Sequence, residues 1–480
     1  MSAVGGNTSL LQRYSQVFPV GSAGSRFTAI LKRRRQRHIE ALDGFAIFAG
    51  VSHEPGAENI WHMNGLKIFQ EPALIHLCGI NQPGIVLALI PGGKSQEILF
   101  VPEKNPDKEF WDGVRFGYPT NGNPKTSKDL KEVRKLTGIQ DVRPMGQFDA
   151  WFVDLVRRNK KSWGYSFYHQ YPDPVKKGGF RVTTTDHNFA FEQRLEKIAI
   201  RARRNFEIRS SASLHFKLRL PLEPEQIKDV AKATAITGSA FIETLRSLSK
   251  FRNENELSAH LEHGMRRRSP YGLSFPSIVA GGRNATVLHY LKNDEPLKHG
   301  SLVLIDFGAR YGTMHADISR TIPLSGKFNP LQRLLYGIVL DALRFNQHNA
   351  KPGNTIRKMN EDVWAFIENE LQTRFYSKGG KAERAYSGKP HGVSHLMGEQ
   401  EHDGDPHRIY HDEPLKPGWQ ISNEPGLYGH FSIRLGGRRY AEWIGIRIED
   451  NLLVTPKGCR NLSESIPREP EDIERLIGLD

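Results

Sequence analysis

Two apolar runs separated by Tyr311-Gly312 constrain the fold of this chain more than any other stretch. Residues 301 to 321 read SLVLIDFGARYGTMHADISRT, and the strand-favouring residues on both sides of the turn predict a β-hairpin. Pairing across Tyr311-Gly312 predicts that Asp306 lies opposite Asp317 on one face. Directly opposed Cβ atoms lie roughly 4.5 to 5.5 Å apart, and two acids that close require a cation or a shared proton. The hairpin indicates a metal site, unless a register shift of one residue places the acids on opposite faces.

The length and composition predict a soluble protein of more than one domain. At 480 residues the chain exceeds one ordinary core, and its 38% hydrophobic and 25% charged residues are typical of globular proteins. We expect an N-terminal arm over residues 1–25, an α/β domain over 26–213 and a second domain over 214–480. Strands are predicted in the first domain at 44–50, 73–80, 85–90 and 97–103, and helices at 127–138, 148–159 and 188–209.

A formal net charge of +14 raises the question of an anionic partner. The densest basic run, residues 32–38, lies in a predicted helix whose inner face holds Phe27, Ile30, Leu31 and Ile39, with the arginines facing solvent. Since no nucleic-acid-binding motif accompanies this run, neither nucleic acid nor a membrane is expected as a partner. Two cysteines far apart in sequence, and an N-terminus without a secretory pattern, lead us to expect a cytoplasmic protein.

The second domain carries clear helix-start signals. Pro224 follows an acid and opens one predicted helix, and Asn253 is expected to cap the next. Asn329-Pro330 starts a third, and a fourth is predicted over 355–375. The basic, glycine-rich segment 376–390 is predicted to be a surface loop.

Three further fragments place chemically active side chains beside apolar runs. HGVSHLMGEQEHDGD carries His391, His395 and His402, and ISNEPGLYG places Glu424 at the end of a strand-like run before a Pro-Gly turn. WIGIRIEDN places Glu449 in a predicted strand. The candidate metal ligands are Asp306, Asp317, His395, Glu424 and Glu449.

One imidazole and four carboxylates form a hard, mostly oxygen ligand set. Such a set suits Mn²⁺, our first expectation, and also Co²⁺, Zn²⁺ or Fe²⁺. Because four carboxylates carry too much charge for one divalent ion, we expect two ions, and hydrolysis is the predicted chemistry.

In this order, the fragments VLHY, LVLIDFGARYGTMHADISRT, HGVSHLMGEQEHD, EPGLY and GIRIEDN resemble the metallopeptidases of the aminopeptidase P, prolidase and methionine aminopeptidase superfamily. The stretch LIHLCGINQPGIVLALIP also resembles part of the N-terminal domain of aminopeptidase P. The resemblance implies an α/β (α+β) protein, in which a creatinase-like N-terminal α/β domain precedes a pita-bread domain with a curved antiparallel sheet.

The resemblance also implies roles for individual residues. Asp306 would bind one metal, Asp317 and Glu449 would bridge both, and His395 and Glu424 would complete the second, with Glu424 also moving a proton. His289, His391 and His402 match histidines that orient the substrate and stabilise the tetrahedral intermediate, and Arg447 matches an arginine of the pocket.

The function implied by these roles is that of an Xaa-Pro aminopeptidase, an enzyme that releases the first residue from peptides with proline at the second position. An Xaa-Pro dipeptidase (prolidase) is the first alternative. It is placed second because the segments around the site lack the longer insertions associated with prolidases. A non-catalytic pita-bread binding module is the second alternative, although such relatives have typically lost ligands. A creatinase-like C–N hydrolase is disfavoured because that branch works without the metal ligands. Relatives are often dimers or tetramers, so a homo-oligomer is expected.

Overall fold

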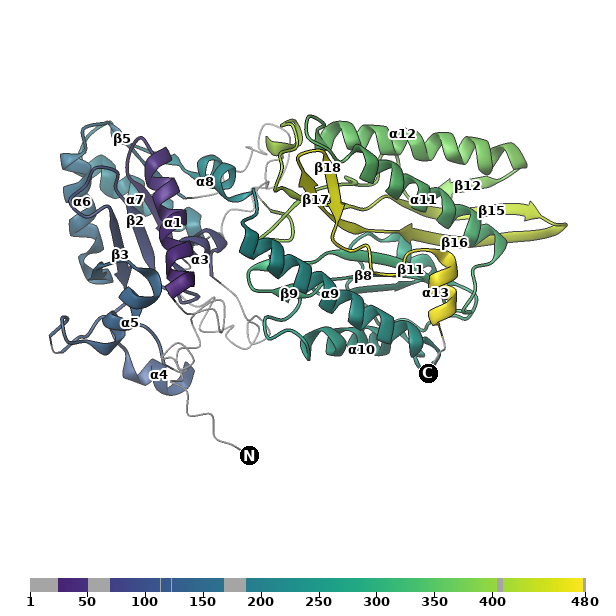
Figure 1. Ribbon diagram of the computed structural model, residues 1–480, viewed down its shortest axis with the longest axis horizontal. Coiled ribbons are helices and arrows are strands. Elements are labelled where there is room, and N and C mark those ends of the chain that lie inside the picture. Colours follow the sequence, from purple (N-terminus) through teal and green to yellow (C-terminus); the bar gives the residue numbers. More distant parts are fainter. Residues whose placement is uncertain are drawn as a thin grey trace. The chain divides into compact units, whose positions relative to one another are not determined.

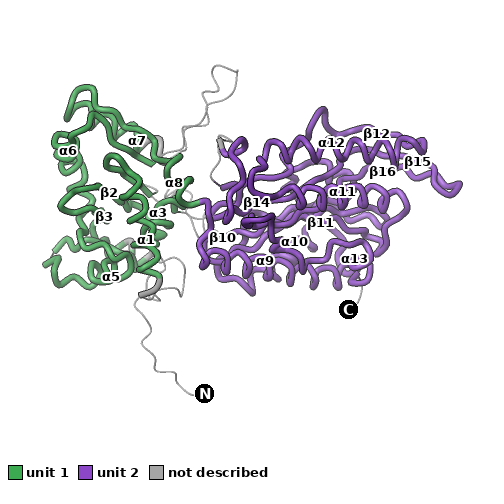
Figure 2. The backbone as a smooth tube through the Cα atoms, turned by 45° about the horizontal axis from the view of Figure 1, so that its top comes forward, with its two compact units in different colours: residues 1–219 green, residues 220–480 purple. Residues whose placement is uncertain are grey.

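The computed structural model describes residues 25–50, 70–112, 114–121, 123–167, 187–403 and 409–477. The chain forms two compact units, Met1–Arg219 and Leu220–Asp480 (Figure 2). The expected N-terminal arm lies outside the described residues except for Ser25. From the sequence the division was placed at residue 213. In the structure helix α8 (Ala212–Arg219) belongs to the first unit, where Nδ1 of His215 lies 3.0 Å from Nε2 of His38.

The first unit is built around a mixed sheet. Its described strands follow the order β4-β3-β2-β1-β5-β6, with β1, β2 and β3 antiparallel and the outer pairs parallel. The strands are β1 (Ala46–Ala49), β2 (Val86–Leu89), β3 (Glu97–Val101), β4 (Asp141–Pro144), β5 (Trp163–Ser166) and β6 (Glu207–Ser210). The helices are α1 (Ser25–Ala41), α3 (Pro72–Cys78), α4 (Pro106–Asp112), α5 (Lys128–Thr137), α6 (Phe148–Arg158), α7 (His187–Ala202) and α8.

Two segments of this unit differ from the secondary structure predicted for them. The run 73–80 is helix α3 and not a strand, because Glu71 caps it, Pro72 occupies its first turn and Gly79 ends it at a φ of +73°. Its helical period is hidden in the sequence because the helix is buried on all sides. The helix predicted over 188–209 ends at Ala202, and strand β6 follows it.

The prediction that the arginines of α1 face solvent is wrong for Arg34 and Arg35, which are 6% and 0% exposed. Arg35 donates to the carbonyls of Leu77 and Thr137 at 2.8 and 2.7 Å and pairs with Glu97 at 3.1 Å. These bonds satisfy the buried guanidinium, so part of the basic run supports the fold and contributes nothing to a surface charge.

The second unit packs long helices along several antiparallel sheets (Figure 1). Its helices are α9 (Pro224–Arg246), α10 (Glu254–Arg266), α11 (Pro330–Asn349), α12 (Ile356–Arg374) and α13 (Pro470–Leu476). Its strands are β7 (Ile278–Gly281), β8 (Leu302–Phe307), β9 (Arg310–Tyr311), β10 (Met314–His315), β11 (Ile318–Pro323), β12 (Lys381–Arg384), β13 (Leu396–Met397), β14 (Gln420–Asn423), β15 (Gly426–Leu435), β16 (Arg438–Arg447), β17 (Asp450–Thr455) and β18 (Gly458–Asn461).

The helix starts of this unit are confirmed. Asn253 caps α10 by accepting from Glu256 N at 2.8 Å, and Asn329 forms a capping box with Gln332 at the start of α11. The loop prediction for 376–390 is wrong in part, because β12 lies inside it and pairs with β15. An edge strand can form from such a polar sequence because β15 supplies its backbone partners.

Alternation along the strands separates the core from the site. On β8, Val303, Ile305 and Phe307 join the core cluster with the helices, which leaves Asp306 on the opposite face. On β11, Ile318 and Ile322 face the same core. No helix in the described part of the chain is both long and apolar enough to cross a membrane.

Candidate metal centre

The β8–β11 hairpin has a different register from the one predicted. Asp306 pairs with Ser319, and Gly312 with Thr313 forms the turn between β9 and β10. The register therefore shifts by two residues relative to a turn at Tyr311-Gly312, so Asp306 and Asp317 share a face as diagonal neighbours and are not directly opposed. Gly312 accounts for the shift, since its φ of +60° suits the first position of a tight turn.

A second pair of strands brings two glutamates together. Glu424 directly follows β14, as predicted, but Pro425 leads straight into β15 without a turn. Glu449 lies in the link between β16 and β17 and not within a strand. Asn423 pairs with Asp450 and Gly426 pairs with Arg447, so the two ladders share one register and Glu424 faces Glu449 across the interruption.

The imidazole of His395 points its free nitrogen at this group of acids. Nδ1 lies 3.1 Å from the carbonyl oxygen of Leu396, and because a carbonyl can only accept, Nδ1 carries the hydrogen. In the neutral ring Nε2 is then an acceptor, and it lies 3.4 Å from Oε1 of Glu424 and 3.7 Å from Oδ2 of Asp317. Acceptors facing one another need a cation or a proton between them.

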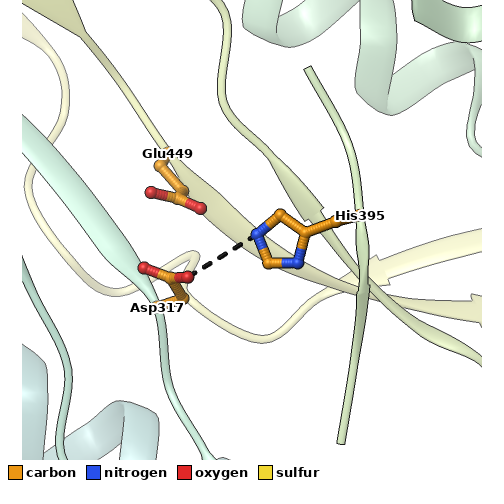
Figure 3. Close-up of side chains that lie close together, drawn as sticks. All are labelled: Asp317, His395 and Glu449. Atoms are coloured by element: carbon orange, nitrogen blue, oxygen red, sulfur yellow. Dashed lines mark ion pairs between the residues drawn. The ribbon is translucent and has the colours of Figure 1, made fainter. Parts of the chain in front are cut away.

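Side chains from three separate segments converge on a common centre, as Figure 3 shows for Asp317, His395 and Glu449. One ligand atom from each of these residues lies within 4.8 Å of the others. Oε1 of Glu449 and Oδ1 of Asp306 are buried without a hydrogen-bond partner among the described residues. Buried carboxylate oxygens are rarely left unpaired, so the donor set fits divalent metal ions.

Burial and mutual repulsion disfavour the ionised forms of these acids. Burial, with Glu449 as the main neighbouring charge, raises the pKa of Asp317 well above its ordinary value. Burial and then Glu424 likewise raise the pKa of Glu449. Burial raises the pKa of Glu424 to about 8, with Asp306 adding to the effect. Burial also lowers the pKa of His395 well below its ordinary value, which keeps the ring neutral. A bound cation would reverse the penalty on the acids.

Arg447 and Ser319 hold the acids in place. Nη2 of Arg447 donates to Oδ2 of Asp306 at 2.5 Å, and its Nε donates to Oγ of Ser319 at 2.7 Å. The Ser319 hydroxyl donates in turn to Oε2 of Glu449 at 2.9 Å. One oxygen of Asp306 and one of Glu449 are thus occupied, and the second oxygen of each remains available for a metal.

His391 is held by contacts on both ring nitrogens. Nδ1 lies 2.8 Å from the carbonyl oxygen of Gly392, and Nε2 lies 2.9 Å from the hydroxyl of Tyr428. Burial lowers the pKa of His391 to about 4, with Arg447 as the largest neighbouring charge that lowers it, so the ring is neutral near pH 7. The neutral ring donates to Gly392 and accepts from Tyr428.

Every predicted site residue lines one cavity of about 530 Å³. His289 and His402 are the more exposed of them, and the ring of His402 stacks on that of His395 at a centroid distance of 3.8 Å. The cavity is lined by all five candidate ligands, by His289, His391, His402 and Arg447, and by apolar residues that include Phe275, Leu288 and Leu291.

Three residues of the site were not found from the sequence. Ser319 lies two positions after Asp317 and therefore on the same strand face, which was a usable signal. Tyr428 follows His391 by 37 residues in the sequence, and only the fold brings the two side chains together. Glu401 directly precedes His402 and lines the cavity, and burial together with the charge of Asp306 raises its pKa to about 7.

The fold and the convergent acids define a metallopeptidase. Residues 228–456 match the model of metallopeptidase family M24, and residues 31–163 match the model of the aminopeptidase P N-terminal domain. The chain is 31% identical to the Xaa-Pro aminopeptidase of Escherichia coli, over 93% of this chain and 97% of that protein. It is 30% identical to the mitochondrial intermediate cleaving peptidase 55 of Arabidopsis thaliana, over 85% and 75%.

A solved structure shows the same architecture in both units. The aminopeptidase PepP of Pseudomonas aeruginosa superposes with a TM-score of 0.73 at 25% identity, covering 94% of this chain and 98% of the other. The chain belongs to the aminopeptidase P family, and it has that family's fold, with an N-terminal aminopeptidase P domain before an M24 domain.

Proposed function

We propose that this metallo-aminopeptidase removes the first residue from peptides whose second residue is proline, using two divalent metal ions. The observation that carries the proposal is that Nε2 of His395 lies 3.4 Å from Oε1 of Glu424 and 3.7 Å from Oδ2 of Asp317 in a buried site. Its membership of a family that includes an Xaa-Pro aminopeptidase supports the substrate class. No relative reported above carries a dipeptidase name, so a prolidase is not favoured.

We propose the following division of the ligands. Asp306 would hold one ion, His395 and Glu424 would hold the other, and Asp317 and Glu449 would serve both. The free oxygens of Asp306 and Glu449 support this assignment, because Arg447 and Ser319 fix their other oxygens. Mn²⁺ remains our first expectation for the ions, with Co²⁺, Zn²⁺ and Fe²⁺ as alternatives.

When bound, two such ions activate water and polarise a carbonyl at neutral pH. The chain's own residues position the peptide and transfer protons. Glu424 accepts a proton from the attacking water and returns it to the leaving proline nitrogen. His289 and His402 line the cavity, where an imidazole N–H can donate to an oxygen that gains negative charge. An Xaa-Pro bond has no amide N–H, so recognition must use the carbonyl, the proline ring and the free amine.

The remaining expectations are also proposals. Peptides are the expected partners, and a cytoplasmic location stays a prediction, since one reported relative is mitochondrial by name. A homo-oligomer, dimer or tetramer, also stays a prediction.

The test compares three peptides on protein stripped with EDTA and reloaded with each metal in turn. Leu-Pro-Leu should release leucine, whereas Leu-Ala-Leu and the dipeptide Leu-Pro should be cleaved at least tenfold more slowly. Asp317→Ala is the inactive control. Absence of metal uptake would favour a binding module, and cleavage confined to Leu-Pro would favour a prolidase.

A further inference from the structure

Glu401 and Asp403 line the cavity besides the four proposed carboxylate ligands, and the proposed reaction gives Glu401 no role. Its side chain is 30% exposed, whereas those of Asp317 and Glu424 are 5% and 15% exposed. Glu401 is therefore more accessible to a molecule that enters the cavity than Asp317 and Glu424 are.

No permanent positive charge of the described chain neutralises Glu401. Within 4.0 Å of its carboxylate, the described residues offer one group that can be charged, Nε2 of His402 at 3.6 Å. Burial lowers the pKa of His402 below its ordinary value, so this imidazole carries little charge at pH 8. Arg447 is the one lysine or arginine among the described residues that line the cavity, and it is bound to Asp306.

Two divalent ions would be held by the four proposed carboxylate ligands, and Arg447 is bound to Asp306. Neither the ligand set nor Arg447 pairs a positive charge directly with Glu401, so a cation carried by a bound peptide can pair with it in the partly buried cavity.

The same cavity offers apolar surface. Phe275, Leu288 and Leu291 line it, and Leu291 is 56% exposed. A lysine or arginine side chain matches this combination, because its methylene stem can lie on apolar surface while its charged end reaches an acid. A neutral or acidic side chain would leave Glu401 unpaired.

We propose that Glu401 is a specificity-determining residue, which favours peptides carrying a lysine or arginine side chain next to the scissile bond. The inference rests on the proposed peptidase function and deepens it by naming a substrate class. The basic side chain can come from the first residue of the peptide or from the residue after proline, and separate substrates distinguish the two sources.

The experiment measures kcat/KM at pH 8 for Leu-Pro-Leu, Arg-Pro-Leu and Leu-Pro-Arg with the metal-loaded full chain. One arginine peptide should exceed Leu-Pro-Leu roughly tenfold, and Glu401→Gln should abolish that ratio, as expected for a hydrogen bond between charged groups. Glu401→Arg should reverse the preference towards Leu-Pro-Glu or Glu-Pro-Leu, which a purely structural role would not do. Glu383→Gln, at an exposed acid on β12, is the matched control and should leave the ratios unchanged.

Equal ratios in the wild-type protein and Glu401→Gln would overturn the proposal. So would an equal loss on all three peptides, because Glu401 would then act on the common amine or on site assembly. Calorimetric binding of the same peptides measures the preference without turnover. If no peptide is cleaved, the proposed function fails, and equal binding of arginine and leucine peptides then decides against Glu401 as well.

Discussion

Replacing Glu424 by glutamine should make the metal-free protein less sensitive to rising pH. The unfolded carboxyl group has an ordinary pKa of 4.5, and burial holds it at about 8 in the folded chain. Between these values the folded state binds more protons than the unfolded state, so stability is highest below pH 4.5 and falls as pH rises towards 8. Each unit of the shift corresponds to about 1.4 kcal/mol, which gives roughly 4 kcal/mol lost from this group between about pH 5 and pH 8.

Scanning calorimetry in EDTA at these two pH values is the assay. The transition of the metal-binding unit is identified as the one that added Mn²⁺ raises, since a ligand that binds only the folded state stabilises it. In a unit of this size a loss of 4 kcal/mol lowers Tm by roughly 10 °C. Glu424→Gln should remove most of this decrease, because the amide cannot ionise.

The exposed Glu383→Gln substitution serves as the control and should keep the wild-type pH dependence. Equal decreases in Tm for wild type and Glu424→Gln would refute the view that ionisation of the buried Glu424 destabilises the metal-free protein. Metal should also restore stability at pH 8 more than at pH 5, because the ligands must be ionised to bind it.

Three further outcomes are expected. Asp317→Ala should reduce bound metal from two ions per chain towards none, measured by elemental analysis; retention of one full equivalent would contradict its position between the ions. Arg320→Met should lower the free energy of unfolding of the second unit by about 1 to 3 kcal/mol in urea titrations, since it removes one of the two arginines that pair with the fully buried Asp450 and leaves only Arg468; Oδ1 of Asp450 lies 2.8 Å from Arg320 Nη2. Burial lowers the pKa of His38 to about 4, so the first unit should lose about 3 kcal/mol of stability as pH falls from about 6.5 to about 4; acid titration of His38→Gln should show a smaller loss.

Local sequence signals were sufficient where the interaction itself is local. Asn253 and Asn329 marked helix starts because a capping side chain bonds to backbone only two or three residues away. The five candidate ligands were also proposed from the sequence, because acids at the ends of strand-like runs and a histidine between apolar runs favour binding of a cation or a proton. The fold class was predicted from the resemblance of the ordered fragments to the aminopeptidase P superfamily.

Other features were decided by contacts between distant parts of the chain. Arg35 looked like a solvated charge, but the carbonyls of Leu77 and Thr137 make its burial favourable. Glu424 lies opposite Glu449 because of the register in which β14 pairs with β17 and β15 pairs with β16. The sequence of any one of these strands does not specify that register.

The hairpin shows the division most clearly. Its sequence predicted that Asp306 and Asp317 share a face, because in a hairpin with any two-residue turn two residues an odd number of positions apart lie on the same face. Which residue lies opposite Asp306 was decided by the tertiary structure. There Gly312 takes a positive φ, and Ser319 lies opposite Asp306 within reach of Arg447 and Glu449. The sequence alone could not choose between registers two residues apart, because both bury the same apolar face, and only the partners across the site distinguish them.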